Sequence, residues 1–310
     1  MDTLIFFSDN MKIRKIHVFF VLFIIMSLSS VLLINDGFWN NDDIKIYNIS
    51  VITKGKSNES LMVMKEGIDQ AASEMNVNVS FIRLSEENNI DEQISLLHRE
   101  VKNNADAILI SPVDYEKMSK EIEEVRRKTP IVLVDSKIKT EQPIPYIGCD
   151  NEGLGKSLAD EVIQMGNTRG SIAIVNNNLE YSSIRERYTG FMEIISKSNN
   201  EVEFIELPLD EREAYDEVSY ILKQRRYNAI ITFDVKVLEV LAQCKKDLNL
   251  ESESIIETEI YGMGGTSKAT SFLDDDIIKA VAIQNEFNIG YLGIKMAVDI
   301  INNKSVKDTF

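Results

Sequence analysis

From residue 44 onward, short runs of β-branched and apolar residues alternate with longer segments whose apolar residues recur at helical spacing. In the segment 60–75, for example, Leu61, Met64 and Ile68 fall on one face of a helix. The first half of this pattern predicts strands over 44–53, 77–84, 105–112 and 130–136, with helices over 60–75, 91–104 and 118–127. Such an alternation predicts a parallel sheet covered on both faces by helices.

The same pattern restarts after residue 146 and runs to about residue 301. It predicts helices over 154–165, 185–196, 214–224, 237–248 and 291–301, and strands over 170–177, 201–208, 228–234, 259–265 and 279–285. No linker rich in proline, glycine or serine separates the two halves. We therefore expect two α/β lobes of similar size, with a ligand-binding cleft between them at the carboxyl ends of the strands.

An uncharged apolar run at 18–34 precedes these lobes and follows Lys12, Arg14 and Lys15. Basic residues before such a run predict that the N-terminus stays in the cytoplasm and that the following chain crosses the membrane. The run holds 17 residues, the lower limit of the roughly 17–25 residues that span a bilayer. We expect either an uncleaved anchor, or a cleaved signal whose core is 18–26.

The anchor is favoured because the chain turns apolar again at 31–34 and no Ala-x-Ala cleavage pattern is present. It places the protein in the cell membrane with an extracytoplasmic domain, whereas cleavage would give a secreted or periplasmic protein. Met11 is an alternative start, because the segment 11–20 has the form of a normal signal opening.

The net charge, the few cysteines and histidines, and the absence of catalytic motifs exclude several classes of function. A net charge of −16 argues against nucleic acids and anionic lipids as partners. Cys149 and Cys244 are too few for a disulfide framework, although one bridge between them stays open, and His17 and His98 are the only histidines. The sequence has no G-x-G-x-x-G after a strand, no G-x-S-x-G and no metal-ligand spacing. We therefore expect no catalysis, no cofactor and no metal.

Polar residues follow nearly every predicted strand. They lie at 53–60, 111–114, 135–136, 176–183, 234, 262–266 and 284–285. Their amides, carboxylates and hydroxyls suit hydrogen bonding to ligand hydroxyls. Each one alone is equally well explained as a helix N-cap. Their convergence on one edge of each sheet favours a binding site for a small polar ligand.

Six segments, taken together in their order and spacing, resemble the type I periplasmic binding proteins, the ribose-binding-like sugar receptors of bacterial transport. They are 67–79, 105–114, 130–136, 146–162, 185–191 and 289–304. The resemblance implies two Rossmann-like lobes with parallel sheets, joined by a three-crossover hinge near 139–150, near 284–287 and after 304. With the apolar run assigned to a cytoplasmic stub and signal-anchor helix at 1–40, we expect an N-terminal lobe of 41–148 plus 286–310 and a C-terminal lobe of 149–285.

The resemblance also implies which residues bind the ligand. Asn58, Asp135, Arg185 and Gln284 match positions at which the family contacts its sugar, and together they imply a multidentate, charge-assisted site. Asp234, one of the polar residues that follow a predicted strand, is a further candidate ligand contact.

Other positions depart from the family. Ser136 stands where an arginine is common, Phe233 replaces an asparagine, and Ser60 and Leu61 replace the usual stacking aromatics. Phe233 and Tyr181, from the second lobe, are our hypothesis for the missing stacking surface. Gly264 replaces an aspartate, and the chain stops at Phe310, before the strand that usually completes the third crossover.

The function that follows is an extracytoplasmic receptor that closes on a small polar ligand, a monosaccharide by resemblance. Its membrane partner is either an ABC permease or a sensor histidine kinase, and a retained anchor without a lipid-carrying cysteine favours the sensor. The alternative is a ligand-free interaction scaffold that kept the fold. An exported enzyme lacks a visible nucleophile–base pair, and the repressors of this fold carry a DNA-binding helix pair where this chain has its apolar run.

Overall fold

The computed structural model describes residues 17–31, 45–55, 58–177, 179–251 and 255–309. The chain divides into two units, 1–45 and 46–310. In the first, residues 17–31 form a helix whose side chains are all exposed, and the rest of the predicted apolar run, 32–34, lies outside the described residues. Across the described parts of the chain, no helix has both the length and the apolarity of a membrane span.

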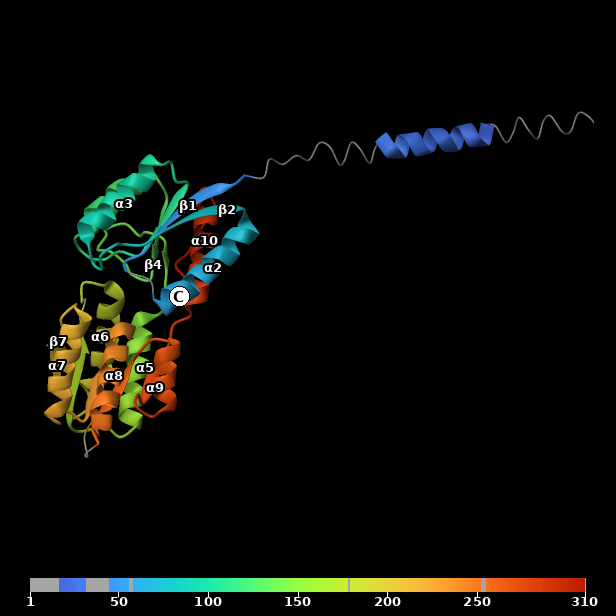
Figure 1. Cartoon of the computed structure of the whole chain (residues 1–310). Coiled ribbons are helices and arrows are strands. Elements are labelled where there is room, and N and C mark those ends of the chain that lie inside the picture. The colour runs from blue at the N-terminus through green and yellow to red at the C-terminus, as the bar shows by residue number, and fades with distance from the viewer. Residues whose placement is uncertain (1–16, 32–44, 56–57, 178, 252–254, 310) are drawn as a thin grey trace, which may run out of the picture. The chain divides into compact units, whose positions relative to one another are not determined.

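The second unit begins with a five-stranded sheet in the order β2-β1-β3-β4-β5, in which all pairs are parallel. The strands are β1 (Tyr47–Ile52), β2 (Val77–Ile82), β3 (Ala107–Ile110), β4 (Ile131–Val134) and β5 (Tyr146–Ile147), and the helices of this lobe are α2 (Glu59–Met75), α3 (Ile90–Lys102), α4 (Ser119–Val125) and α10 (Glu286–Ile301). Figure 1 shows α3 on one face of the sheet and α2 with α10 on the other. Every residue of β3 and β4 is buried, as expected of central strands covered on both faces.

A second parallel sheet follows in the order β10-β9-β8-β6-β7. Its strands are β6 (Ser171–Asn176), β7 (Glu201–Glu206), β8 (Ala229–Ile231), β9 (Glu259–Met263) and β10 (Ala280–Ala282), and its helices are α5 (Asn151–Gln164), α6 (Ser182–Ile195), α7 (Glu211–Lys223), α8 (Val235–Glu251) and α9 (Ser267–Asp274). Apolar residues of α5 and α6 pack on one face, and those of α7, α8 and α9 on the other. The prediction of two parallel α/β lobes is therefore confirmed.

Each lobe contains one pair of helices whose backbones are in contact through glycine. A Cβ built on Gly67 of α2 would lie 2.0 Å from a backbone oxygen of α10, and one on Gly290 of α10 would lie 2.1 Å from a backbone oxygen of α2. Gly155 of α5 and Gly190 of α6 are related in the same reciprocal way, at 2.0 Å each. Any larger residue at these positions would collide with the backbone of the facing helix, so the glycines allow the two helices of each pair to pack in direct contact.

The chain crosses between the lobes at 148–150 and again at 283–285. The expected third crossover, after 304, is not formed by the residues described up to 309. Instead Thr309 pairs in parallel with Ile147 of β5, and its backbone N–H donates to the Tyr146 carbonyl at 3.3 Å. The end of the described chain thus returns to the edge of the first sheet, because the outer edge of β5 offers unpaired backbone groups.

Candidate functional site

Side chains that follow β1, β4 and β10 meet between the two lobes. The Lys54 ammonium donates to Asp135 Oδ2 at 2.5 Å and to Ser136 Oγ at 3.1 Å. Gln284 Nε2 donates to the other carboxylate oxygen, Asp135 Oδ1, at 3.4 Å. Of the predicted residues, Asp135, Ser136 and Gln284 are therefore brought together, as the carboxyl ends of parallel strands require.

Asp135 is the electrostatic centre of this group. It is buried, and its backbone adopts a left-handed conformation with φ of 61°, which aspartate tolerates better than most residues. Burial opposes its ionisation, but the charges of Lys54 and Arg187, together with hydrogen bonds from Lys54 and Gln284, lower the pKa of Asp135 below its usual value. The site therefore holds an ionised carboxylate at neutral pH.

Arg187 of α6 connects this carboxylate group to the second lobe. Its buried guanidinium donates from Nε to Asn151 Oδ1 at 2.8 Å, from Nη1 to the Phe233 carbonyl at 3.0 Å, and from Nη2 to Gln284 Oε1 at 2.8 Å. Three of its donors thus hold α5, the end of β8 and the crossover after β10 in one arrangement.

Arg185, which the sequence nominated, does not lie in this group. Its side chain is exposed, donates to the Leu179 carbonyl at 3.4 and 3.3 Å, and lies over the Tyr115 ring at 4.7 Å. Two positions along a helix are about 200° apart, so Arg185 and Arg187 face different sides of α6. A ligand contact by Arg185 stays a prediction. The sequence did contain the signal, since Arg187 shares its helix face with apolar Ile184 and Phe191, both buried.

Asn58 and Asp234 lie in strand-end loops but act as helix caps. Asn58 Oδ1 accepts from the Leu61 N–H at 2.8 Å at the start of α2. Asp234 Oδ1 accepts from the backbone N–H groups that open α8, at 2.8 and 3.2 Å. The capping alternative thus accounts for their contacts in this structure, and a ligand role for either stays a prediction.

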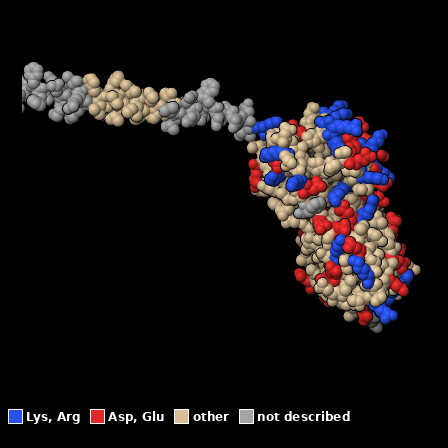
Figure 2. All heavy atoms as spheres, turned by 180° about the vertical axis from the view of Figure 1, so that it is seen from behind, with Lys and Arg blue, Asp and Glu red and all other residues tan. Residues whose placement is uncertain are grey.

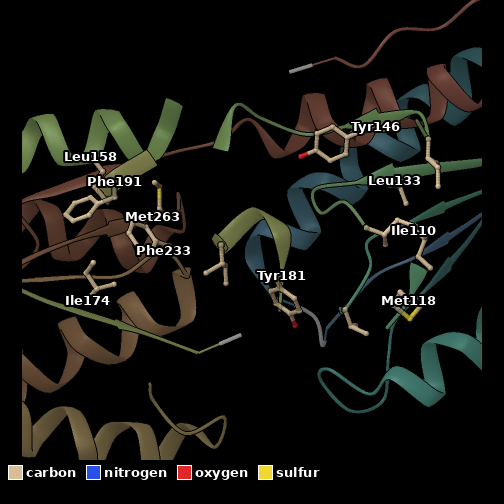
Figure 3. Packing of buried hydrophobic residues seen from close by; sticks show 14 of the residues in the cluster. Ile110, Met118, Leu133, Tyr146, Leu158, Ile174, Tyr181, Phe191, Phe233 and Met263 are labelled. Atoms are coloured by element: carbon tan, nitrogen blue, oxygen red, sulfur yellow. The ribbon is translucent and has the colours of Figure 1, made fainter. Parts of the chain in front are cut away.

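Phe233 is not placed to stack on a ligand. Its ring is fully buried in the second lobe, with its centroid 5.6 Å from that of Phe191 and 6.4 Å from that of Tyr188. Figure 3 shows it within that lobe's apolar cluster, whereas Tyr181 lies between the clusters of the two lobes. In this structure Phe233, two residues beyond the central strand β8, belongs to the core of the second lobe. A stacking role for it stays a prediction.

Tyr181 is placed as the hypothesis required, but the protein's own cation covers it. Lys54 Nζ lies 4.1 Å from the centroid of the Tyr181 ring, a cation–π contact between the lobes. The Tyr181 hydroxyl donates to Asn88 Oδ1 in the first lobe. Beside it, the hydroxyls of Ser136 and Ser183 are 3.1 Å apart. The lobes are thus bridged at the site itself.

Further polar contacts between the lobes surround this group. Lys137 Nζ lies 2.9 Å from Glu186 Oε1, and the Lys137 N–H donates to Ser182 Oγ at 2.6 Å. Glu59, at the start of α2, accepts from the N–H and hydroxyl of Ser267 at 2.9 and 2.6 Å.

The sequence pattern does not identify Lys54, Lys137 or Glu186 as members of this group, and Arg187 is not among the predicted contacts. Lys54 lies in one of the polar segments that follow a strand, but nothing in the sequence shows that its side chain turns toward Asp135. Both cysteines are free thiols, so the bridge left open by the sequence does not form. Among the described residues, no group of histidine, cysteine, aspartate and glutamate is arranged to hold a metal ion.

Comparisons with known proteins decide the family. A family model described as "Periplasmic binding protein domain" matches residues 49–305. The chain belongs to the periplasmic binding protein family. Its members bind ligands without catalysis, so the expectation of a non-enzymatic protein is confirmed, and membership implies an extracytoplasmic location. A search of curated proteins found no match.

Several solved structures share this fold. A carbohydrate transporter solute binding protein from Agrobacterium radiobacter, in complex with D-arabinose, has a TM-score of 0.78 at 20% identity, with 84% of this chain and 90% of that chain covered. GanP, a glucose-galactose binding protein from Geobacillus stearothermophilus, has a TM-score of 0.78 at 21% identity, with 86% of this chain and 96% of that chain covered. The XylFII–LytSN complex has a TM-score of 0.76 at 23% identity, with 85% of this chain and 96% of that chain covered.

Proposed function

We propose that residues 46–310 form an extracytoplasmic receptor that binds a monosaccharide between its two lobes. The observation that carries this is the network in which Asp135 and Gln284 meet Arg187 from the opposite lobe. Carboxylate, amide and guanidinium groups provide the paired acceptors and donors that sugar hydroxyls need. Binding between the lobes would stabilise the closed arrangement and so shift the balance between open and closed forms.

The test is a thermal-shift screen of the purified protein against pentoses, hexoses and cyclic polyols, followed by calorimetry on any sugar that raises the unfolding temperature. A ligand that binds only the folded state at a hundredfold excess over Kd adds about 2.7 kcal/mol of apparent stability. A shift that Asp135→Asn and Arg187→Ala abolish would support a sugar site at these residues. Absence of any shift in a folded protein would count against a sugar receptor.

The partner we propose is a membrane sensor kinase rather than an ABC permease. The support is the apolar N-terminal run, proposed as a retained anchor, and the absence of a cysteine near its end that a lipid would modify. A relative in fold is solved together with LytSN. Membrane retention of the mature protein, together with sugar-dependent crosslinking to a kinase, would support sensing. A soluble product cleaved near residue 30 would instead favour transport.

A ligand-free scaffold is the second candidate, and one observation favours it: the protein's own Lys54 already occupies the Asp135 carboxylate. In a scaffold, substitutions of Asp135 and Arg187 would leave partner binding unchanged if the fold is intact. In a receptor they would abolish the sugar dependence of that interaction.

A further inference from the structure

Glu286, at the first position of α10, has one carboxylate oxygen without a hydrogen-bond partner. Its Oε1 accepts from Gln284 Nε2 at 2.5 Å. Its Oε2 is enclosed by protein and has no partner among the described residues, although the side chain as a whole is only partly buried. Enclosed acceptors are almost always hydrogen-bonded, because leaving one unpaired costs about 1–3 kcal/mol. An orphan oxygen beside a binding network therefore suggests that its donor comes with the ligand.

The groups around Glu286 come from every element that meets at the site. Asp135 follows β4, Lys54 follows β1, Arg187 projects from α6, and Cys149 lies in the first crossover; all act electrostatically on or with this carboxyl. Burial, followed by repulsion from Asp135, raises the pKa of Glu286 to about 7, against the opposing effects of Gln284, Arg187 and Lys54. The carboxyl group of Glu286 is therefore about half ionised at neutral pH.

The charges of the group are balanced when Glu286 is ionised. Three cations, Lys54, Lys137 and Arg187, face three acids, Asp135, Glu186 and Glu286. Two of the cations form direct ion pairs, Lys54 with Asp135 and Lys137 with Glu186. A ligand with a net charge would leave an uncompensated charge beside the buried Asp135 and Arg187, which is unfavourable. The balance favours an uncharged ligand.

We propose that Glu286 is a specificity-determining ligand contact, whose enclosed Oε2 accepts a hydrogen bond from a hydroxyl of an uncharged sugar or polyol. The inference rests on the proposed sugar-binding function and deepens it. Gln284 Nε2 bridges Glu286 and Asp135, so the two carboxyl groups lie side by side and present acceptors to neighbouring hydroxyls. Sugar acids, sugar phosphates and amino sugars are excluded by the charge balance.

Proton release follows from this contact. A hydroxyl that donates to Oε2 stabilises the ionised carboxyl, so binding near neutral pH releases a fraction of a proton from Glu286 to the solvent. If the contact lowers the pKa of the bound state by about one unit, affinity rises roughly fivefold between about pH 6 and pH 8.

The experiment is isothermal titration calorimetry on the full chain in mild detergent. The ligands are D-arabinose, D-galactose, D-glucose, D-fucose and myo-inositol, with D-galacturonate, galactose 6-phosphate and D-galactosamine as charged counterparts. Each titration is run near pH 6, 7 and 8 and, at neutral pH, in phosphate and in imidazole, whose different heats of ionisation report proton release. Wild type is compared with Glu286→Gln, which keeps the shape and the acceptor for Gln284.

His98→Gln is the matched control, because His98 lies outside the site, is exposed on α3 and is paired with Glu121. For wild type and His98→Gln, we expect that an uncharged ligand binds, that its affinity rises with pH and that its binding releases protons. For folded Glu286→Gln, we expect neither the rise in affinity with pH nor the release of protons. Affinity independent of pH, a dependence of opposite sign, one that survives in Glu286→Gln, or preference for a charged counterpart would overturn the proposal. Binding of none of the sugars would instead overturn the proposed function itself.

Discussion

The Lys54 ammonium and the Asp135 carboxylate lie 2.5 Å apart, so the acid that the sequence nominates for ligand binding is already paired with a cation of the protein. A ligand hydroxyl must therefore share Asp135 with Lys54 or displace it. The pair is largely buried and unites the loops after β1 and β4. It is one of the two direct ion pairs of the site, and we expect it to contribute to the stability of the first lobe.

Lys54→Met should destabilise the protein at neutral pH by about 1–3 kcal/mol, because it leaves a buried carboxylate without its main partner. The folded pKa of Asp135 is depressed, so this contribution is present above the unfolded pKa near 4 and is lost as pH falls through the folded pKa. Urea unfolding near pH 7 and near pH 3 measures both effects. Lys65→Met, which removes an exposed i,i+4 pair with Asp69, is the control and should change stability by less than about 0.5 kcal/mol. An equal loss in both variants would contradict a special role for the buried pair.

Arg187→Ala should weaken sugar binding by about 2–5 kcal/mol, since it removes a buried charge with three hydrogen bonds across the lobes. Arg185→Ala, two positions away and exposed, should leave affinity within about 0.5 kcal/mol of wild type. Calorimetry with the best sugar of the screen compares them, after circular dichroism has shown both variants to be folded. A larger loss in Arg185→Ala would restore the original assignment.

Glu59→Gln should loosen the contact at the start of α2, because hydrogen bonds from the hydroxyl and N–H of Ser267 lower the pKa of Glu59 and favour its charged form. Without ligand, we expect a larger radius of gyration in small-angle scattering, and with saturating sugar the wild-type value. The expected loss of affinity is less than about tenfold, since only the balance of open and closed forms changes. Glu74→Gln, on the same helix but bonded within the lobe to Tyr291, is the control. Identical scattering of all three proteins would show that this contact does not hold the lobes together.

Glu286→Gln should also change the pH dependence of stability in the absence of ligand. The folded pKa of Glu286 lies above its unfolded value, so its contribution is fully present below about pH 4.5 and is lost as pH rises through about 7. We expect wild type to lose about 1–3 kcal/mol over that interval relative to the variant, a range reduced because the side chain is partly exposed. Urea unfolding at four pH values tests this. Parallel curves for the two proteins would show that the carboxyl has an ordinary pKa.

Gly155→Ala should destabilise the second lobe by about 1–3 kcal/mol, because the added methyl group would overlap a backbone oxygen of α6 at 2.0 Å. That oxygen belongs to Arg187, so sugar affinity should fall in parallel. Ser157→Ala, exposed on the same helix, is the control and should be nearly neutral. Thermal unfolding and calorimetry are the measurements, and an unchanged Gly155→Ala would mean that the two helices can separate without loss.

The fold was predictable because strand and helix periods differ and each segment shows its own period clearly. The strand-end rule also gathered Asp135, Ser136 and Gln284, since parallel strands deliver their carboxyl ends to one edge. The choice between Arg185 and Arg187 required the helix face, which the buried neighbours of Arg187 indicate but a motif match does not.

Lys54 and Glu286 could not be predicted from the pattern. A charged residue after a strand or at a helix start has solvent as its default environment, and only the tertiary arrangement turns these two inward. Phe233 shows a different limit, because an aromatic residue just beyond a central strand can belong either to the core or to a contact surface.

The reciprocal glycines that lock α2 to α10 and α5 to α6 have a consequence for what the protein can report. If each lobe is braced by such a pair, we expect any movement of the lobes to bend the chain mainly in the short segments 148–150 and 283–285. In the receptor that we propose, different ligands would then produce the same closing movement. A partner that responds to this movement would not distinguish one sugar from another, so the discrimination would have to take place inside the site.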